Sequence, residues 1–240
     1  QMVFMRNKHY YSFLFIVGLS LFGSYYFSQK LVYYSDRSFE YPITPPVQML
    51  KQLAGINRVW SYGDGYMMRN IPSYFRLYSA EGYDALYPQR YAELLYSIRT
   101  KGKLTNQVNR TDADLSEAGI DDRMEDNWYR RRVMALTATK YILEPKNNDS
   151  TKKQAAPQIR FPSNLFTPVW EDSEWRIWEY LDALPRAMLT SSYVVEKNEQ
   201  KTLDILFDPQ TNLQTTVILD TEPNGRVKIG KAKEDAFGDA

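Results

Sequence analysis

Residues 10–27 read YYSFLFIVGLSLFGSYYF, eighteen consecutive residues without a charged side chain. As an α-helix this stretch would be roughly 27 Å long at 1.5 Å per residue, close to the thickness of the hydrocarbon core of a bilayer. Tyrosine and phenylalanine side chains stand at both ends, where aromatic rings are enriched at the water–lipid interface. The stretch therefore predicts a transmembrane helix over residues 10–28, with membrane lipid as its surroundings.

Two other interpretations of this stretch stay open. A signal peptide would use Arg6 and Lys8 as its basic region, but aromatic residues 25–27 occupy the place where a cleavage site of small residues should lie. A helix buried in a protein core would more often carry polar residues on one face. A membrane helix would also offer small residues to neighbouring transmembrane helices, namely Gly18, Ser20, Gly23 and Ser24.

The membrane interpretation divides the chain into five parts. We expect a cytoplasmic flank over residues 1–9, the membrane helix, an exit segment over 29–45, an extracytoplasmic domain over 46–222 and a charged tail over 223–240. Basic residues flank both ends of the helix almost equally, so the orientation follows mainly from the long C-terminal domain. The chain begins with Gln1, which leads us to expect a longer protein with further spans upstream.

The composition excludes several classes of protein. The chain has 240 residues, of which 43% are hydrophobic and 25% charged, enough for one core of moderate size. A net charge of +1 does not favour nucleic acid as a partner. There is no cysteine, and His9 is the only histidine, which excludes disulfides, thiolate metal sites and, in one copy of the chain, a Ser-His-Asp triad or a metal site with several imidazoles.

The part after the membrane helix alternates between helical and extended patterns. Apolar spacing and capping residues predict helices over 45–54, 88–98, 128–138 and 199–206. Short apolar runs predict strands over 58–62, 140–143, 167–170, 176–180, 187–195 and 215–219. Residues 147–157 are polar and predict a loop. This order indicates an α/β or α+β domain with a mixed sheet.

Several segments taken together resemble one family. They are Arg58-Val59-Trp60, Asn70, residues 78–87 (YSAEGYDALY), Arg90-Tyr91, residues 138–143 (ATKYIL), Ile177-Trp178-Glu179-Tyr180, Ala183-Leu184-Pro185-Arg186-Ala187, Phe207-Asp208-Pro209 and Val217-Ile218-Leu219. In their order and spacing, over about residues 10–220, they resemble the extracytoplasmic domain that follows the last spans of YfhO-like bacterial membrane proteins.

The resemblance implies a function for the longer protein. YfhO-like proteins are related to the GT-C glycosyltransferases and are implicated in adding sugars to cell-envelope polymers from lipid-linked donors. The implied partner is a lipid-linked sugar or a cell-envelope glycan, in a bacterial cell membrane. The catalytic carboxylate of GT-C enzymes is expected near the first spans. This chain would therefore shape the acceptor site without being catalytic, and a divalent cation is expected only in the full-length protein.

The candidate binding residues lie mostly in an aromatic segment. Ten of the thirty-seven residues from 60 to 96 are aromatic, and such rings stack on sugars while tyrosine hydroxyls form hydrogen bonds. For any single tyrosine, however, we favour a structural role, in which the ring packs in a core or covers the membrane surface. The candidates from this segment are Arg69, Asn70, Tyr83, Asp84 and Arg90. Arg186 is a further candidate, for substrate or for holding a carboxylate or backbone carbonyls.

Acidic and basic runs give two weaker predictions. Asp112 and Asp114 have the spacing of a pair that bridges a divalent cation, but a solvated acidic face is the interpretation that we favour for residues 112–126. The three arginines at 130–132 would bind phosphate or an anionic head group, or pair with the acidic run, which we favour.

Two further hypotheses about function belong to other classes. One is a surface protein with a single span and a non-catalytic domain that binds glycan or a protein. The other is a secreted α/β enzyme that relies on carboxylates such as Asp84, Asp112 and Asp114. Whether hydrophobic spans are encoded upstream of Gln1 distinguishes the leading hypothesis from the first of these.

Overall fold

The computed structural model describes residues 2–31, 36–61, 67, 69–84, 87–106, 108, 112–115, 127–146, 161–190 and 192–223, with side chains from residue 9 onward. The chain forms two compact units, Gln1–Thr44 and Pro45–Ala240. The predicted loop over 147–157, most of the acidic run and nearly all of the predicted charged tail lie outside the described residues.

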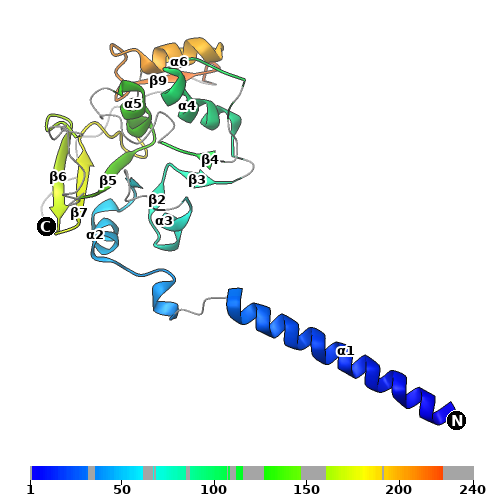
Figure 1. Cartoon of the computed structure of the whole chain (residues 1–240). Helices are drawn as coiled ribbons and strands as arrows, with labels where there is room; N and C mark the ends of the chain where they lie inside the picture. The colour runs from blue at the N-terminus through cyan, green and yellow to red at the C-terminus, as the bar shows by residue number, and fades with distance from the viewer. Residues whose placement is uncertain are drawn as a thin grey trace, which may run out of the picture. The chain divides into compact units, whose positions relative to one another are not determined.

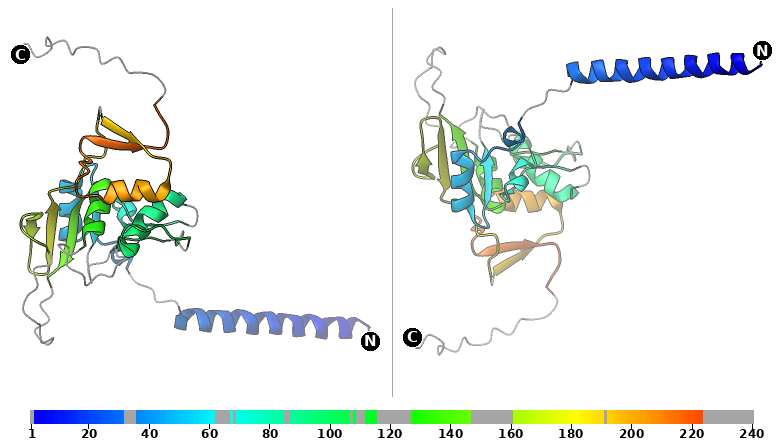
Figure 2. Two further views of the ribbon diagram at one scale, coloured as in Figure 1. Left: turned by 90° about the horizontal axis from the view of Figure 1, so that it is seen from above. Right: turned by 90° about the horizontal axis from the view of Figure 1, so that it is seen from below.

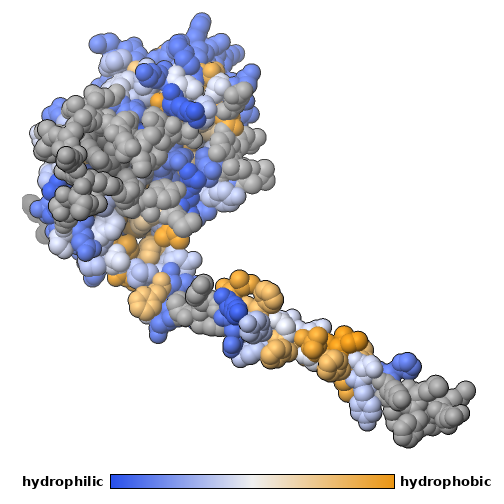
Figure 3. All heavy atoms as spheres, in the orientation of Figure 1, coloured by the Kyte–Doolittle hydropathy of each residue, from blue (hydrophilic) through white to orange (hydrophobic). Residues whose placement is uncertain are grey.

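The first unit consists of the helix α1 (Met2–Leu31) and a single turn η1 (Arg37–Phe39). The stretch His9–Leu31 is long and apolar enough to cross a membrane, and none of its most apolar window is buried. Apolar side chains cover much of its visible surface (Figure 3). The helix extends beyond the predicted residues 10–28 at both ends.

The second unit is built on a mixed five-stranded sheet, as predicted (Figure 1). Its strand order is β2-β1-β5-β7-β6. The strands β1 (Arg58–Ser61), β2 (Tyr78–Ser79) and β5 (Thr139–Pro145) are parallel to one another. The strands β6 (Phe166–Glu171) and β7 (Trp175–Tyr180) form an antiparallel hairpin that joins β5 through β7.

Helices cover both faces of this sheet (Figure 2). The helix α2 (Pro45–Ala54) packs on one face with Val59, Tyr141 and Leu143. The other face packs against α4 (Gln89–Thr100), α5 (Trp128–Leu136) and α6 (Glu199–Phe207), around Trp60 and Ile142. Successive residues of β1 and β5 thus enter opposite cores, as the pleat of a strand requires. The unit is an α/β sandwich with one core on each side.

Two small sheets and one short helix complete the unit. The strands β3 (Gly82–Tyr83) and β4 (Asp112–Ala113) pair antiparallel, and β8 (Ser192–Val195) and β9 (Thr216–Leu219) pair parallel. The helix α3 (Ile71–Tyr74) connects β1 to β2. The sequence did not predict α3, β2, β3 or β4, which span only two to four residues each.

The predicted helices and strands otherwise form close to their expected positions, with one clear exception. The strand predicted over 187–195 begins only at Ser192, and residues 187–190 are not extended in a sheet. The partner strand β9 begins at Thr216, which pairs with Ser192. The described residues 187–190 therefore have no neighbouring strand in register, and hydrophobic character alone does not make a strand without such a partner.

Candidate functional site

The carboxyl ends of β1 and β2 place several polar side chains together. Because the two strands are parallel, both end at the same edge of the sheet, which is where ligands bind in open α/β sheets. Trp60 lies at the end of β1, and Glu81 follows β2 after one residue. The pair β3–β4 brings Asp112 to the same region through Arg69. We call Arg69, Glu81, Asp112 and Asp114 the edge cluster.

Arg69 connects two loops of the edge cluster. Its Nη1 lies 2.5 Å from Oδ1 of Asp112, and its Nη2 lies 2.6 Å from Oδ2 of Asp114. The three side chains are largely buried, with exposed fractions of 24%, 26% and 18%. One guanidinium thus bridges the two carboxylates, for which the sequence analysis considered a divalent cation or solvent as the partner. The predicted solvated acidic face is therefore wrong for these two residues, because Arg69 folds onto them.

Glu81 is the most perturbed carboxyl group in the edge cluster. Its Oε1 accepts hydrogen bonds from the indole Nε1 of Trp60 at 2.9 Å and from the backbone nitrogen of Leu115 at 3.0 Å. Burial raises the pKa of Glu81 to about 8, and the nearby charge of Asp114 adds to the rise. Glu81 is thus mostly protonated at neutral pH, and its neighbour Asp114 pairs with Arg69.

Asn70 and Tyr83 form a rigid rim next to the edge cluster. Asn70 has a left-handed backbone with φ of 74°, a conformation that asparagine tolerates better than most residues. Its Nδ2 donates to the carbonyl of Tyr83 at 2.8 Å, and its Oδ1 accepts from the nitrogen of Tyr83 at 3.1 Å. The backbone of Tyr83 is therefore fixed, while its side chain is 62% exposed and the neighbouring Asp84 is also exposed.

Replacing Asn70 tests this rim. Asn70→Gly keeps the left-handed backbone but removes both side-chain hydrogen bonds, so the free energy of unfolding should fall by about 1–2 kcal/mol. Asn70→Ala should lose about 1 kcal/mol more, because a Cβ opposes this backbone conformation. Urea unfolding followed by tryptophan fluorescence measures both. Equal stability of the two variants would contradict the role assigned to the backbone.

The remaining predicted site residues lie elsewhere. Arg90 forms exposed ion pairs with Asp220 at 3.3 Å and Glu199 at 4.0 Å. Arg186 donates to the carbonyl of Ile56 at 3.0 Å and lies over the ring of Tyr78 at 4.8 Å. Ile56 precedes β1 and Tyr78 begins β2. Arg186 therefore lies at the amino ends of these parallel strands, whereas the edge cluster lies at their carboxyl ends. The predicted residues thus belong to three places, and Arg186 holds a backbone carbonyl.

The arginine run lies in α5, and most of the acidic run with which it was predicted to pair lies outside the described residues. Arg130 is fully buried, donates from Nε to the carbonyl of Leu115 at 2.8 Å and lies 5.6 Å from the ring of Trp60. Arg132 donates to the carbonyl of Leu206 at the end of α6 and to the carbonyl of Thr211 in the turn that follows. Arg130 and Arg132 thus bind backbone oxygens of the protein itself and do not form a free basic surface.

Sequence reasoning missed Glu81 as the centre of the cluster. It lies within the segment YSAEGYDALY that carries the family resemblance. Like Asn70 and Asp84, Glu81 is a polar residue within a largely apolar stretch, and this signal could have found it. Its raised pKa depends on its burial in the folded protein and on Asp114, which is 33 positions away, so the sequence alone held no sign of it.

The edge cluster holds carboxylates, a guanidinium and a carboxyl group that titrates near neutral pH. A carboxyl with a pKa of about 8 beside an ionised one is a pattern also used for proton transfer. Here Oε1 of Glu81 already accepts two hydrogen bonds from the protein, and Arg69 neutralises both aspartates. Among the described residues no group of three or more histidine or acidic side chains is arranged to hold a metal ion. The geometry thus favours a role in holding the exposed rim at Tyr83.

Comparison with known proteins gives no family for the chain, since no family model, no curated protein and no solved structure matches it.

Proposed function

We propose that this chain is the membrane-anchored, extracytoplasmic portion of a GT-C-like bacterial envelope glycosyltransferase, and that its α/β domain shapes the site of the glycan acceptor without transferring sugar. The proposal combines the resemblance to YfhO-like proteins with two features of the structure, namely the apolar helix α1 and the edge cluster. Its partners would be membrane lipid, neighbouring membrane helices and a lipid-linked sugar or envelope glycan.

The observation that carries the proposal is the exposure of α1. Large apolar side chains are exposed around the helix, as shown by Ile16 at 62%, Leu19 at 63% and Phe22 at 68%. A helix that is apolar on all sides needs a protein core or a lipid bilayer around it. Within its own unit the described residues give it no such cover. A lipid bilayer surrounds apolar side chains in this way. It offers no hydrogen-bond partners to the backbone, and a helix needs none, because its backbone groups pair with one another.

The edge cluster supports a binding role over a catalytic one. The carboxylates that the sequence offered for chemistry, Asp112 and Asp114, are engaged by Arg69. The rim next to them presents the ring of Tyr83 to solvent on a fixed backbone. An exposed aromatic ring on a fixed backbone is the kind of surface on which a sugar stacks.

A surface protein with a single span is the second candidate. It is favoured by the fact that the described residues contain one helix suitable for crossing a membrane. Its α/β domain would bind glycan or a protein and would serve no transferase. Sequencing the encoding gene distinguishes the two candidates, because hydrophobic spans upstream of Gln1 support the first and an initiator codon at this position supports the second.

A charge in the middle of α1 tests the anchor. Leu19→Arg should cost about 3 kcal/mol of insertion free energy at the centre of a membrane helix and shift the expressed chain from the membrane to the soluble or aggregated fraction. Gln29→Arg, near the end of the helix, is the matched control and should stay in the membrane. The measurement is flotation with membranes after carbonate extraction. Wild-type chain that stays soluble after carbonate would contradict the proposal.

The assignment of roles has its own test. The chain is reconstituted in lipid vesicles with a polyprenyl-phosphate-linked glucose donor and a soluble glycan acceptor. We expect no transfer of sugar by the chain alone, and transfer only when the upstream portion of the protein is present. Transfer by the chain alone would show that the α/β domain is itself catalytic.

A further inference from the structure

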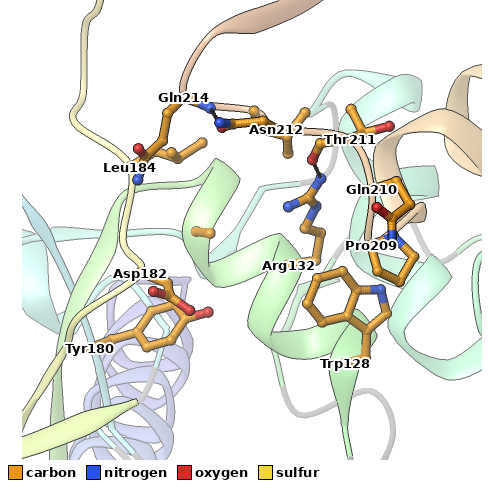
Figure 4. Close-up of a pocket in the computed structure, with 12 residues that line it drawn as sticks. Trp128, Arg132, Tyr180, Asp182, Leu184, Pro209, Gln210, Thr211, Asn212 and Gln214 are labelled. Atoms are coloured by element: carbon orange, nitrogen blue, oxygen red, sulfur yellow. Dashed lines mark hydrogen bonds between the residues drawn. The ribbon is translucent and has the colours of Figure 1, made fainter. Parts of the chain in front are cut away.

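A second polar site lies away from the edge cluster, in a pocket between three segments (Figure 4). The pocket is formed by α5, by the segment that follows β7 and by the turn that follows α6. Its volume is about 270 Å³, just below the range of roughly 300–1,000 Å³ typical of sites for small molecules. A ligand held there must be small, or be one unit of a larger molecule.

Arg132 forms one wall of the pocket and is held in place by the protein. Its Nε donates to the carbonyl of Leu206 at 2.7 Å, and its Nη2 donates to the carbonyl of Thr211 at 2.5 Å. The guanidinium lies 5.3 Å from the centre of the Trp128 ring. The third nitrogen, Nη1, takes part in neither bond and points toward the cavity (Figure 4). The pocket therefore has a fixed donor at this wall.

Asp182 forms the opposite wall, directly after β7. Its side chain is exposed and lies across the cavity from Arg132, beside the ring of Tyr180 (Figure 4). Tyr180 donates from its hydroxyl to the carbonyl of Arg131 at 3.3 Å, and burial together with the charge of Asp182 raises its pKa. Tyr180 thus stays neutral, and Asp182 is a charged acceptor that faces the cavity.

Carboxamides complete the rim. Gln210, Asn212 and Gln214 come from the turn after α6. The Oδ1 of Asn212 accepts from the nitrogen of Gln214 at 2.9 Å, which leaves the amide hydrogens of Asn212 as donors. The bonds from Arg132 to the end of α6 and to this turn hold the rim against α5. The pocket thus offers both donors and acceptors from a rigid frame.

The charges select the class of ligand. A simple anion would suit Arg132 but would meet the carboxylate of Asp182, and a simple cation would suit Asp182 but would meet Arg132. Hydroxyl groups both donate and accept hydrogen bonds, so a neutral ring with several hydroxyls satisfies both walls and the carboxamides at once. A single sugar unit has this chemistry and a size compatible with a cavity of about 270 Å³.

We propose that this pocket binds one monosaccharide unit of a glycan, with Asp182 accepting from its hydroxyls and Arg132 and Asn212 donating to them. The inference rests on the proposed function for the source of the sugar. The inference adds to the proposed function a specific binding site with named residues, and this site is distinct from the rim at Tyr83.

The experiment titrates the whole chain in lipid nanodiscs with glucose and, separately, with N-acetylglucosamine. The reporter is the indole N–H signal of Trp128 in nuclear magnetic resonance spectra, because Trp128 lines the pocket and its Nε1 donates to the carbonyl of Phe207 at 2.8 Å. We expect a saturable shift of this signal with at least one of the two sugars. Inorganic phosphate and glycine, a zwitterion, serve as competing classes of ligand.

Asp182→Asn should weaken the sugar affinity about tenfold, because a charged acceptor contributes more to a hydrogen bond than a neutral one. The fold should survive, since the Asp182 side chain is exposed. Glu174→Gln, an exposed acid in the turn at the other end of β7, is the matched control and should leave the affinity unchanged. Asn212→Ala should also weaken binding.

Three results would overturn the inference: no saturable shift with either sugar, tighter binding of phosphate or glycine than of sugar, or unchanged affinity in Asp182→Asn. These results are separable from failure of the proposed function. A chain that floats with membranes but binds no sugar in the pocket contradicts only this inference. A chain that binds sugar there but does not enter membranes contradicts the proposed anchor.

Discussion

Glu81→Gln should remove a fall in stability that the wild-type protein shows between about pH 5 and pH 8. In the folded protein the pKa of Glu81 is raised to about 8 from an ordinary value of 4.5. Between these values the folded state binds one proton more than the unfolded state, so its stability decreases as the pH rises. The contribution is fully present below about pH 4.5 and is lost as the pH passes through 8.

The size of this effect follows from the pKa difference. At 1.36 kcal/mol per pKa unit, it amounts to roughly 4–5 kcal/mol across the window as an upper figure. Glutamine has the shape of protonated glutamate, keeps an oxygen to accept from Trp60 and Leu115, and does not titrate. The variant should therefore match the wild type near pH 5 and be clearly more stable at pH 8.

The measurement is urea unfolding at pH 5, 6, 7 and 8, followed by tryptophan fluorescence. All five tryptophans lie in the α/β unit, so the signal reports its unfolding. Glu174→Gln, with an exposed side chain, is the control and should keep the wild-type pH profile. A wild-type protein whose stability is constant or rises over this range would show that Glu81 is ionised in the folded state.

Arg69→Met should lower the free energy of unfolding by about 2–4 kcal/mol at pH 7. The variant leaves the largely buried carboxylates of Asp112 and Asp114 without their guanidinium, and a buried charge that loses its partner is costly. We place the loss below that of a fully buried pair, because side chains exposed by 18–26% retain some solvation. Methionine retains most of the apolar length of the arginine.

Two comparisons make this prediction specific. Arg90→Met removes an exposed arginine whose side chain is 68% accessible and which also has two acidic partners, so it should cost less than about 1 kcal/mol. Adding Asp112→Asn and Asp114→Asn to Arg69→Met should recover much of the lost stability, because the unpaired charges are then gone. Equal losses for the two arginine variants would mean that the burial of the edge cluster does not matter.

The sequence determined much of the fold through local patterns. The uncharged stretch from residue 10 to 27 is enough to predict a long apolar helix, and α1 contains it. Apolar spacing located α2, α4, α5 and α6, and short apolar runs located β1, β5, β6 and β7. Each of these patterns repeats within a few residues, so it can be recognised without knowledge of the tertiary structure.

The short elements and one strand boundary did not follow from such patterns. The strands β2, β3 and β4 have two residues each, too few to show a period. The strand β8 begins at Ser192 because β9 offers its first partner there. A strand needs a neighbour, and which neighbour it has depends on contacts between distant parts of the chain.

The candidate sites were decided almost entirely by tertiary structure. The sequence drew attention to Arg69 and Asn70, yet Arg69 pairs with aspartates 43 and 45 positions away. Arg186 and Ile56 are 130 positions apart, and the pocket at Asp182 joins three segments. Whether a residue lies in a helix or a strand depends largely on its neighbours in sequence. Which residue its charged side chain pairs with depends on which loops the folded sheet brings within a few ångströms.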